Sequence, residues 1–432
     1  MPALARRGFI PCLMFAALLL VACSSEELNP APTPSKTRPP TITKIAIATT
    51  PEVLVPTPTP TLATSASNPT PRASNPQVAK PAVTDPLLPI FGLFPPIPIP
   101  NRPANLNPLT GLTANPAALQ RRPILVRIGN DEKVRTSNWQ AGLNSADLVF
   151  EELIDQLNNA YANTRYTAVF LSNDPPLLGP VRSGRIVNFQ IAPMLDGALV
   201  HAGASNGTRW LFSVSPMVNL DEYFNQPSYC YIQSHGYQGR LYTSGPRLRE
   251  WLVQKGWEKA IPLFGFDFAD AAPPGQAVKS IALTKAPWPK WDQLEWRYDA
   301  AANKYLRFVT GSALMDNSYP ISAKWGNGAD CVVGKGETKT QVSAANVVVL
   351  YAKHEKTTIV EDSNNSVSVH IILTGQGDAQ FFRDGIMVRG KWQRQSEQEF
   401  FRFTDAAGKP FALKPGNTWF EIVPLGYALD LK

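Results

Sequence analysis

Two arginines and a serine lie close together in the string GPVRSGR, residues 179–185. Arg182 and Arg185 are three residues apart, and Ser183 stands between them. Because the string follows an apolar segment and precedes a helical pattern, we expect both guanidinium groups on one face at the start of a helix. A helix N-terminus carries free N–H groups and partial positive charge, so this arrangement favours a phosphate or carboxylate ligand.

Further charged residues could extend or neutralise this site. Arg165 stands just before an apolar strand pattern and adds positive charge, while Glu151 and Glu152 supply the opposite charge. Either carboxylate could position a metal or act as a base. The alternative is that one of them pairs with Arg182 or Arg185 in a structural network. The residues alone leave both interpretations open.

His201 and Ser205 belong to the string VHAGAS, residues 200–205. The string comes at the predicted end of a strand, where active-site residues of α/β folds often lie. His201 is therefore a candidate ligand-binding or catalytic residue, and the alternative is a buried histidine with satisfied hydrogen bonds.

The remaining motifs argue against metal and nucleophile chemistry. The four histidines form no paired ligand motif, and no CxxC, SxxK, Walker A or HExxH string is present. We expect no metal and no cofactor. Cys230 and Cys331 are either a disulfide or two buried thiols.

The elements that must position these residues differ between two parts of the chain. In residues 105–265, apolar strand patterns at 123–130, 165–172 and 198–205 alternate with helical ones, among them 244–256. This alternation predicts an N-terminal α/β sheet domain. Residues 277–432 are short alternating runs joined by turns, which predicts a mainly-β C-terminal domain, a barrel or sandwich. Asp384 and Gly385 fit a two-residue hairpin turn.

The first 22 residues resemble a lipoprotein signal peptide. Arg6 and Arg7 precede a 14-residue apolar stretch, and LVAC, residues 20–23, resembles a bacterial lipobox. The stretch is shorter than the roughly 20 residues that a membrane-spanning helix needs. We therefore predict that Cys23 carries lipid and tethers an extracytoplasmic protein to the cell membrane, and the sequence does not distinguish inner from outer membrane.

Residues 23–104 hold much of the 41 prolines of the chain, in PTPTP-type runs. Such a segment predicts a disordered linker that reaches away from the membrane, with an apolar end at residues 87–101 that packs on the folded part or on a membrane surface. The formal charge of +7 is spread without a dense basic tract, so nucleic-acid binding is not expected.

From residue 105 onward the chain contains, in this order, NPLTGL, ADLVFEE, GPVRSGR, HAGAS, GQGDAQFFRDG and PGNTWFEIVP. With these motifs in this order, the chain resembles the YerB family of bacterial lipoproteins. This resemblance implies the same two-part fold outside the cytoplasm. The family is a domain of unknown function, so the resemblance implies no reaction.

Two classes of function agree with these observations. The first is a membrane-anchored envelope lipoprotein that binds an anionic group of a glycan, a lipid-linked intermediate or a partner protein through the Arg-containing loop. The second is an enzyme that acts on a phosphate-containing or glycan substrate and is phosphotransferase-like or hydrolase-like. The strand followed by an Arg-bearing loop is similar, at the level of fold alone, to LytR-CpsA-Psr phosphotransferases. Because no activated nucleophile is recognisable, binding is favoured over catalysis.

Overall fold

The computed structural model describes residues 85–89, 98–155 and 162–432; the predicted signal peptide, Cys23 and most of the predicted linker lie outside them. Strands and short helices share the part before residue 260, and the part after residue 276 is mainly β. The predicted fold class is thus confirmed. None of the described helices combines the length and the apolar character needed to cross a bilayer.

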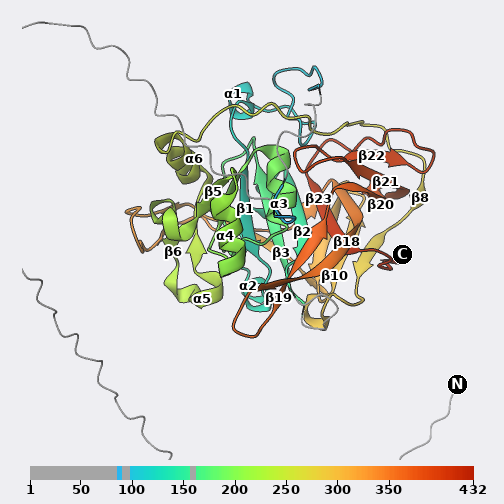
Figure 1. Cartoon of the computed structure of the whole chain (residues 1–432). Helices are drawn as coiled ribbons and strands as arrows, with labels where there is room; N and C mark the ends of the chain where they lie inside the picture. The colour runs from blue at the N-terminus through green and yellow to red at the C-terminus, as the bar shows by residue number, and fades with distance from the viewer. Residues whose placement is uncertain (1–84, 90–97, 156–161) are drawn as a thin grey trace, which may run out of the picture. The chain divides into compact units, whose positions relative to one another are not determined.

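Strands from both parts of the chain join in one sheet (Figure 1). Among the described residues this sheet has 12 strands. Its main path is, in spatial order, β22 (Arg402–Asp405), β21 (Ile386–Arg394), β20 (Gly375–Arg383), β18 (Asn346–Val360), β23 (Thr418–Pro424), β2 (Leu148–Leu153), β3 (Thr164–Phe170), β1 (Ile124–Gly129), β4 (Ala198–His201) and β5 (Val218–Asp221), with β19 (Val367–Ile372) beside β18 and β8 (Gln276–Ala277) beside β21.

Seven strands of this sheet point the same way, and β21 is one of them because β20 is antiparallel to both β18 and β21. β1 is parallel to β4, and β4 to β5. β2 is parallel to β23, and β23 to β18. β3 is antiparallel to both β1 and β2, so these two run in the same direction. The carboxyl ends of β1, β2, β4, β5, β18, β21 and β23 therefore meet at one edge, which we call the carboxyl edge.

A second sheet covers one face of the central strands. Trp296 on β10 lies 5.1 Å from Trp419 on β23, ring centre to ring centre. Its strands are β12 (Ser312–Ala313), β11 (Lys304–Val309), β10 (Leu294–Asp299), β9 (Ser280–Leu283), β24 (Asp430–Leu431) and β17 (Ser343–Ala344). Three small pairs complete the described strands: β13 (Met315–Ser318) with β16 (Thr338–Gln341), β14 (Ile321–Ser322) with β15 (Val332–Val333), and β6 (Cys230–Tyr231) with β7 (Leu241–Tyr242).

The helices are short. The α-helices are α1 (Pro116–Leu119), α2 (Glu132–Thr136), α3 (Asn188–Ile191), α4 (Asn206–Val214), α5 (Gly236–Gly239) and α6 (Gly245–Gln254). The 3₁₀ turns are η1 (Leu143–Ser145), η2 (Ala192–Leu195), η3 (Glu222–Phe224), η4 (Gln226–Ser228), η5 (Gln233–His235) and η6 (Lys290–Asp292).

Several predicted elements form as expected because their signals are local. β1, β3 and β4 are the three predicted strands, and all their residues are buried. α6 begins after Ser244, whose side chain accepts a hydrogen bond from the Arg247 N–H group. Asp384 and Gly385 join β20 to β21 with φ angles of 54° and 72°, as a type I′ turn requires.

The end of the predicted linker contacts the folded part where it is described. Leu87 and Leu88 pack against the main hydrophobic core. Arg102 donates hydrogen bonds to the carbonyl oxygens of Phe264 and Phe266. The apolar stretch at residues 87–101 therefore packs on the protein at its start, whereas Ile99 near its other end is exposed and only the adjoining Arg102 is bonded to the folded part. The middle of the stretch lies outside the described residues.

Candidate functional site

The GPVRSGR segment does not lead into a helix N-terminus. The Arg182 N–H group donates to the Arg127 carbonyl oxygen at 2.8 Å, and the Arg182 carbonyl oxygen accepts from Ala202 N–H at 3.0 Å. The segment thus runs extended between the end of β1 and the residues after β4. α3 begins only at Asn188 and has four residues. The prediction that Arg182 and Arg185 share one face at a helix start is wrong, because backbone N–H and C=O groups of the segment hydrogen-bond with β1 and with the residue after β4.

Arg127 and Glu152 lie beside this segment on one face of the sheet. They form an ion pair, and both side chains are fully buried. The Thr167 hydroxyl donates to Glu152 Oε1 at 2.6 Å. Burial raises the pKa of Glu152 to about 7, because Arg127 and Thr167 offset only part of the desolvation. The predicted candidate Glu152 therefore pairs with Arg127, and not with Arg182 or Arg185.

Arg182 and Arg185 have acidic neighbours but poorly aligned contacts. Arg182 Nε lies 3.3 Å from Asp131, and Arg185 Nε lies 3.5 Å from Glu361. Neither Nε atom has a hydrogen-bond partner among the described residues, and neither do Asp131 Oδ2 and Glu361 Oε2. These charges are therefore close together without the geometry that makes a buried ion pair strong.

Arg165 is the unusual member of the group. It lies directly opposite Glu152 in the pairing of β2 with β3, yet no carboxylate of the described residues is within 4 Å of its guanidinium group. Its nitrogen Nη1 donates to the Ser183 carbonyl oxygen at 3.3 Å. Burial, and then the positive charges of Arg185 and Arg182, lower the pKa of Arg165 well below its usual value, although the charge of Asp131 acts against the shift. An anionic ligand would stabilise a buried guanidinium that lies beside other arginines and has no carboxylate in direct contact.

One more acid lies at this edge. Asp155 follows β2, and its carboxylate accepts a hydrogen bond from the Asn163 N–H group at 3.2 Å. Burial raises the pKa of Asp155, although Arg185 and Arg165 act against the shift.

We name the four arginines of this region, together with Ser183, the arginine cluster. Its members are Arg127, Arg165, Arg182, Ser183 and Arg185.

Glu151 points to the opposite face of the sheet, because successive strand residues alternate. There it pairs with Arg307 of β11, which also pairs with Glu421 of β23 at 2.7 Å. All three side chains are fully buried. Trp296 donates from Nε1 to Glu421 at 2.8 Å. Glu151 is thus part of a network between the two sheets and does not join the arginine cluster.

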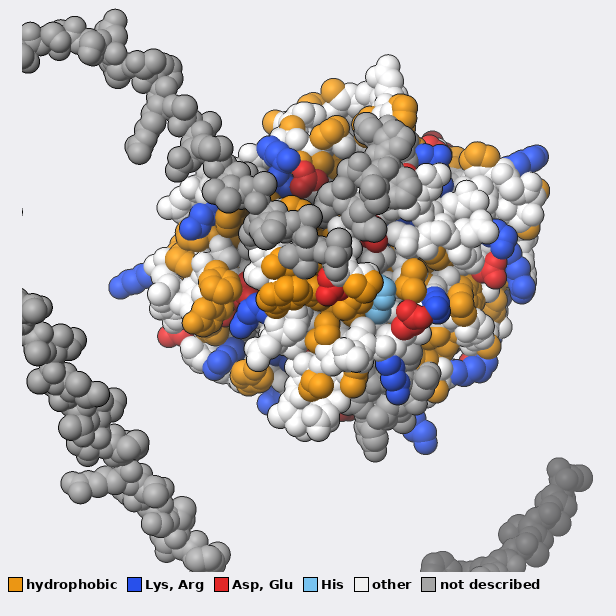
Figure 2. Space-filling view, viewed as in Figure 1, with side chains coloured by type: hydrophobic (Ala, Val, Ile, Leu, Met, Phe, Trp, Pro, Cys, Tyr) orange, Lys and Arg blue, Asp and Glu red, His pale blue; other side chains and the backbone are white. Residues whose placement is uncertain are grey.

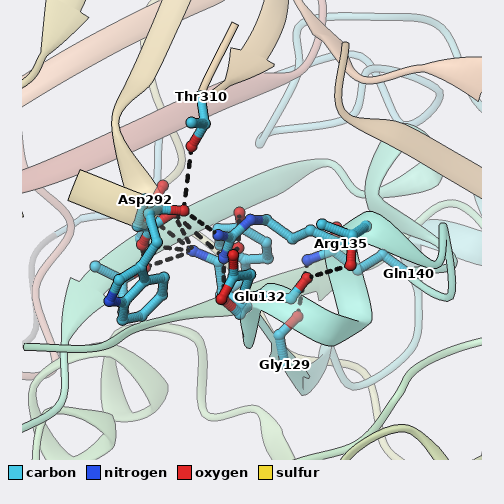
Figure 3. Close-up of polar contacts among 12 residues, drawn as sticks. Gly129, Glu132, Arg135, Gln140, Asp292 and Thr310 are labelled. Atoms are coloured by element: carbon cyan, nitrogen blue, oxygen red, sulfur yellow. Dashed lines mark hydrogen bonds and ion pairs between the residues drawn. The ribbon is translucent and has the colours of Figure 1, made fainter. Parts of the chain in front are cut away.

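The same network continues to α2 and η6. Arg135 and Asp292 point toward each other and form an ion pair at 3.4 Å (Figure 3). The Thr164 hydroxyl donates to Glu151 at 2.6 Å and also lies 3.1 Å from an Asp292 oxygen. We call Glu151, Glu421, Asp292, Arg307 and Arg135 the inter-sheet network.

His201 and Ser205 have structural partners. Nδ1 of His201 lies 2.8 Å from the Gly203 carbonyl oxygen, and Nε2 contacts the Asn219 side chain. Burial lowers the pKa of His201, which favours the neutral ring. Ser205 caps α4 by accepting a hydrogen bond from Thr208 N–H. Both residues lie near the carboxyl edge, but their side-chain polar atoms already form hydrogen bonds within the protein.

The structure decides between a disulfide and two buried thiols for the two cysteines of the folded part. Cys230 and Cys331 form a disulfide with their Cα atoms 5.0 Å apart. Among the described residues, no group of three or more His, Cys, Asp or Glu side chains could hold a metal ion.

A polar hollow of about 560 Å³ lies elsewhere, lined in part by the NPLTGL and PGNT segments. Three of its asparagine side chains hydrogen-bond within the protein. Asn107 donates to Asp147, Asn144 to Thr340, and Asn417 to the Ser343 carbonyl oxygen. These three asparagine side chains therefore have structural roles.

Sequence reasoning missed the acidic partners Asp131, Asp155 and Glu361. Asp131 and Asp155 each follow a strand closely, which is a usable signal once the strand directions are known. Glu361 follows the 15-residue strand β18 and reaches the cluster only because β18 lies in the same sheet.

Known proteins match the chain over both parts. Residues 109–258 match the N-terminal domain of a protein of unknown function (DUF3048), and residues 285–420 match its C-terminal domain. The chain is 27% identical over 324 residues to the Bacillus subtilis (strain 168) protein named "Putative lipoprotein YerB", covering 73% of this chain and 86% of that protein. A crystal structure of YerB from Bacillus subtilis matches with a TM-score of 0.58 and 23% identity, covering 76% of this chain and 99% of the other, which shows the shared fold. On its sequence and its two matched domains, the chain belongs to the YerB-like DUF3048 family.

Proposed function

We propose that this protein is a lipid-anchored envelope protein that binds an anionic group through the arginine cluster. Cys23 would carry the lipid after removal of residues 1–22, and residues 23–104 would serve as the linker. The folded part, proposed as domains at 105–265 and 277–432, would then stand outside the cytoplasm. A relative named as a lipoprotein supports the anchoring.

One observation carries the binding proposal. Arg165 is 6% exposed and has no carboxylate partner among the described residues, while Arg182 and Arg185 add positive charge beside it. A fold gains nothing from a buried, unpaired cation. A bound phosphate or carboxylate would accept hydrogen bonds from Arg165 and from Arg182, whose side chain is 16% exposed.

The enzymatic alternative has less support. Catalysis would require an acid or base to converge with the arginines on the reacting atoms. Glu151 lies on the other face of the sheet, Glu152 is fully buried in its ion pair with Arg127, and the ring nitrogens of His201 already have partners. Binding therefore remains the favoured function.

The test is calorimetric titration of the mature folded part with inorganic phosphate and with glycerol phosphate at low salt. We expect saturable binding, and we expect Arg165→Gln with Arg182→Gln to weaken it at least tenfold. Arg389→Gln, which removes one exposed charge from β21, is the matched control and should bind as wild type does. Equal weakening by the control, or no binding of either anion, would contradict the proposal.

A further inference from the structure

A series of arginine and tyrosine side chains borders the arginine cluster. The Arg182 guanidinium lies 5.9 Å from the centre of the Tyr237 ring, and Arg240 lies 5.6 Å from the same ring. Arg240 also lies 5.4 Å from the Tyr231 ring. Cations at these distances hold an aromatic ring by cation–π attraction.

Further contacts link Tyr231 to Glu222, and a second arginine–tyrosine pair, Arg209 with Tyr223, lies beside the residues that bond to Arg182. The Tyr231 hydroxyl donates to Glu222 at 2.6 Å. The next residue, Tyr223, has its ring centre 5.6 Å from the Arg209 guanidinium. Arg209 packs against Gly203, next to Ala202, whose N–H group bonds to the Arg182 carbonyl oxygen. We call Arg182, Arg209, Arg240, Tyr223, Tyr231 and Tyr237 the arginine–tyrosine rim.

Exposed aromatic rings are concentrated in this region. Among the described residues, the large aromatic side chains that are strongly exposed are Trp210, Tyr223, Phe224 and Tyr237. They belong to α4, η3 and α5, and the first two of these elements follow directly on the carboxyl ends of β4 and β5. Figure 2 shows hydrophobic side chains, with basic and acidic ones beside them, gathered where Figure 1 draws α4. Tyr237 is 79% exposed and Tyr223 64%, so these rings add nothing to the core.

The backbone holds the rim in place. Tyr231 follows Cys230 of the disulfide, and its N–H and C=O groups bond to Ala329 and Cys331. Next to Tyr237, the ring of His235 stacks on Trp139 with ring centres 4.4 Å apart. A surface that is already ordered loses little conformational entropy when a ligand binds.

We propose that the arginine–tyrosine rim receives sugar rings, so that the ligand of the arginine cluster is an oligosaccharide carrying an anionic group. This inference rests on the function proposed above. The flat face of an exposed tyrosine matches the C–H face of a sugar ring, and arginine and carboxylate groups beside it match the hydroxyl groups.

The charges of the rim favour this occupant over a polyanion. Asp131, Asp221 and Glu222 lie among its arginines: Asp221 is 2.9 Å from Arg209, and Asp131 is 3.3 Å from Arg182. A nucleic acid also stacks on aromatic rings, but these negative charges would repel its closely spaced phosphates. A chain of neutral sugars with a single acidic group would not.

The experiment compares three probes: a tetrasaccharide of N-acetylglucosamine whose terminal sugar carries one carboxylate, the same tetrasaccharide without it, and inorganic phosphate. We expect the acidic tetrasaccharide to bind more tightly than the neutral one. Tyr223→Ala with Tyr237→Ala should weaken acidic-tetrasaccharide binding at least tenfold and change phosphate binding less than twofold. Tyr223→Phe with Tyr237→Phe keeps both rings and should bind as wild type does.

Each outcome has a separate meaning. Unchanged tetrasaccharide binding in the alanine variant, or phosphate binding without any tetrasaccharide binding, overturns the sugar-ring inference and leaves the anion site standing. Absence of binding for both phosphate and the acidic tetrasaccharide overturns the proposed function itself. Because Tyr223 and Tyr237 are exposed, an unchanged melting temperature should confirm that the variants are folded.

Discussion

Glu151 and Glu152 are neighbours on β2, yet they belong to two charged clusters on opposite faces of the same sheet. The inter-sheet network is rich in acids: three carboxylates share two arginines, and a second sheet covers them. The arginine cluster has one arginine more than its ion pairs, and Arg182 is partly exposed. Burial is similar in both clusters, so burial alone does not distinguish a structural network from a binding site.

The pKa shifts distinguish the clusters better. Burial alone would lower the pKa of Arg307, but Glu151, Tyr166 and Glu421 together raise it above its usual value. The protein thus stabilises the charge of Arg307. For Arg165, burial and the neighbouring arginines act in the same direction and oppose the charge, and Asp131 offsets only part of this. A buried group whose charged form is disfavoured by its surroundings is therefore a better indicator of a ligand site than a buried group whose charged form is favoured.

The largest expected effect is that of Arg307→Met. It would leave Glu151 and Glu421 buried without their shared cation, which costs about 3 to 5 kcal/mol of unfolding free energy. Urea denaturation followed by tryptophan fluorescence measures this loss. Arg297→Met, on the neighbouring strand β10 with an exposed side chain, is the control and should cost less than about 1 kcal/mol. A similar small loss for both variants would contradict a structural role for the network.

A smaller effect is expected from pH. Burial, and then the charge of Glu151, raise the pKa of Glu421 to about 8. The folded state therefore keeps a proton that the unfolded state has already lost, so unfolding free energy should fall as pH rises. Between pH 7 and 9 the expected fall is about 1 kcal/mol. Glu421→Gln keeps the side chain neutral and should make that fall smaller, while Glu152 and Asp292, whose pKa values burial raises to about 7, still contribute. A pH dependence equal to that of wild type would show that Glu421 is not the group responsible.

The smallest effect on stability is expected at Arg165. Arg165→Met removes a buried cation that the fold opposes, so the free energy of unfolding should stay within about 0.5 kcal/mol of wild type or rise. The same variant should lose phosphate binding if the proposed function is correct. A loss of stability as large as that of Arg307→Met would instead place Arg165 in a structural network and remove the contrast between the two clusters.

Local sequence signals determined much of the fold. The apolar runs of β1, β3 and β4, the cap of α6 at Ser244 and the Asp384–Gly385 turn each depend on residues that are close along the chain. The grouping of Arg165, Ser183 and Arg185 also followed from the sequence, since Ser183 and Arg185 are in one string and Arg165 begins the strand before it.

Only the tertiary structure decided which charges meet. β23 lies between β18 and β2, so strands from the two predicted domains share one sheet, and Glu151 pairs with an arginine 156 residues away. The same sheet brings Glu361 to Arg185 and inserts the GPVRSGR segment beside β1, where it cannot begin a helix. Strand order and register depend on contacts between residues far apart in the chain. The alternation of side chains along β2 then sends Glu151 to one cluster and Glu152 to the other.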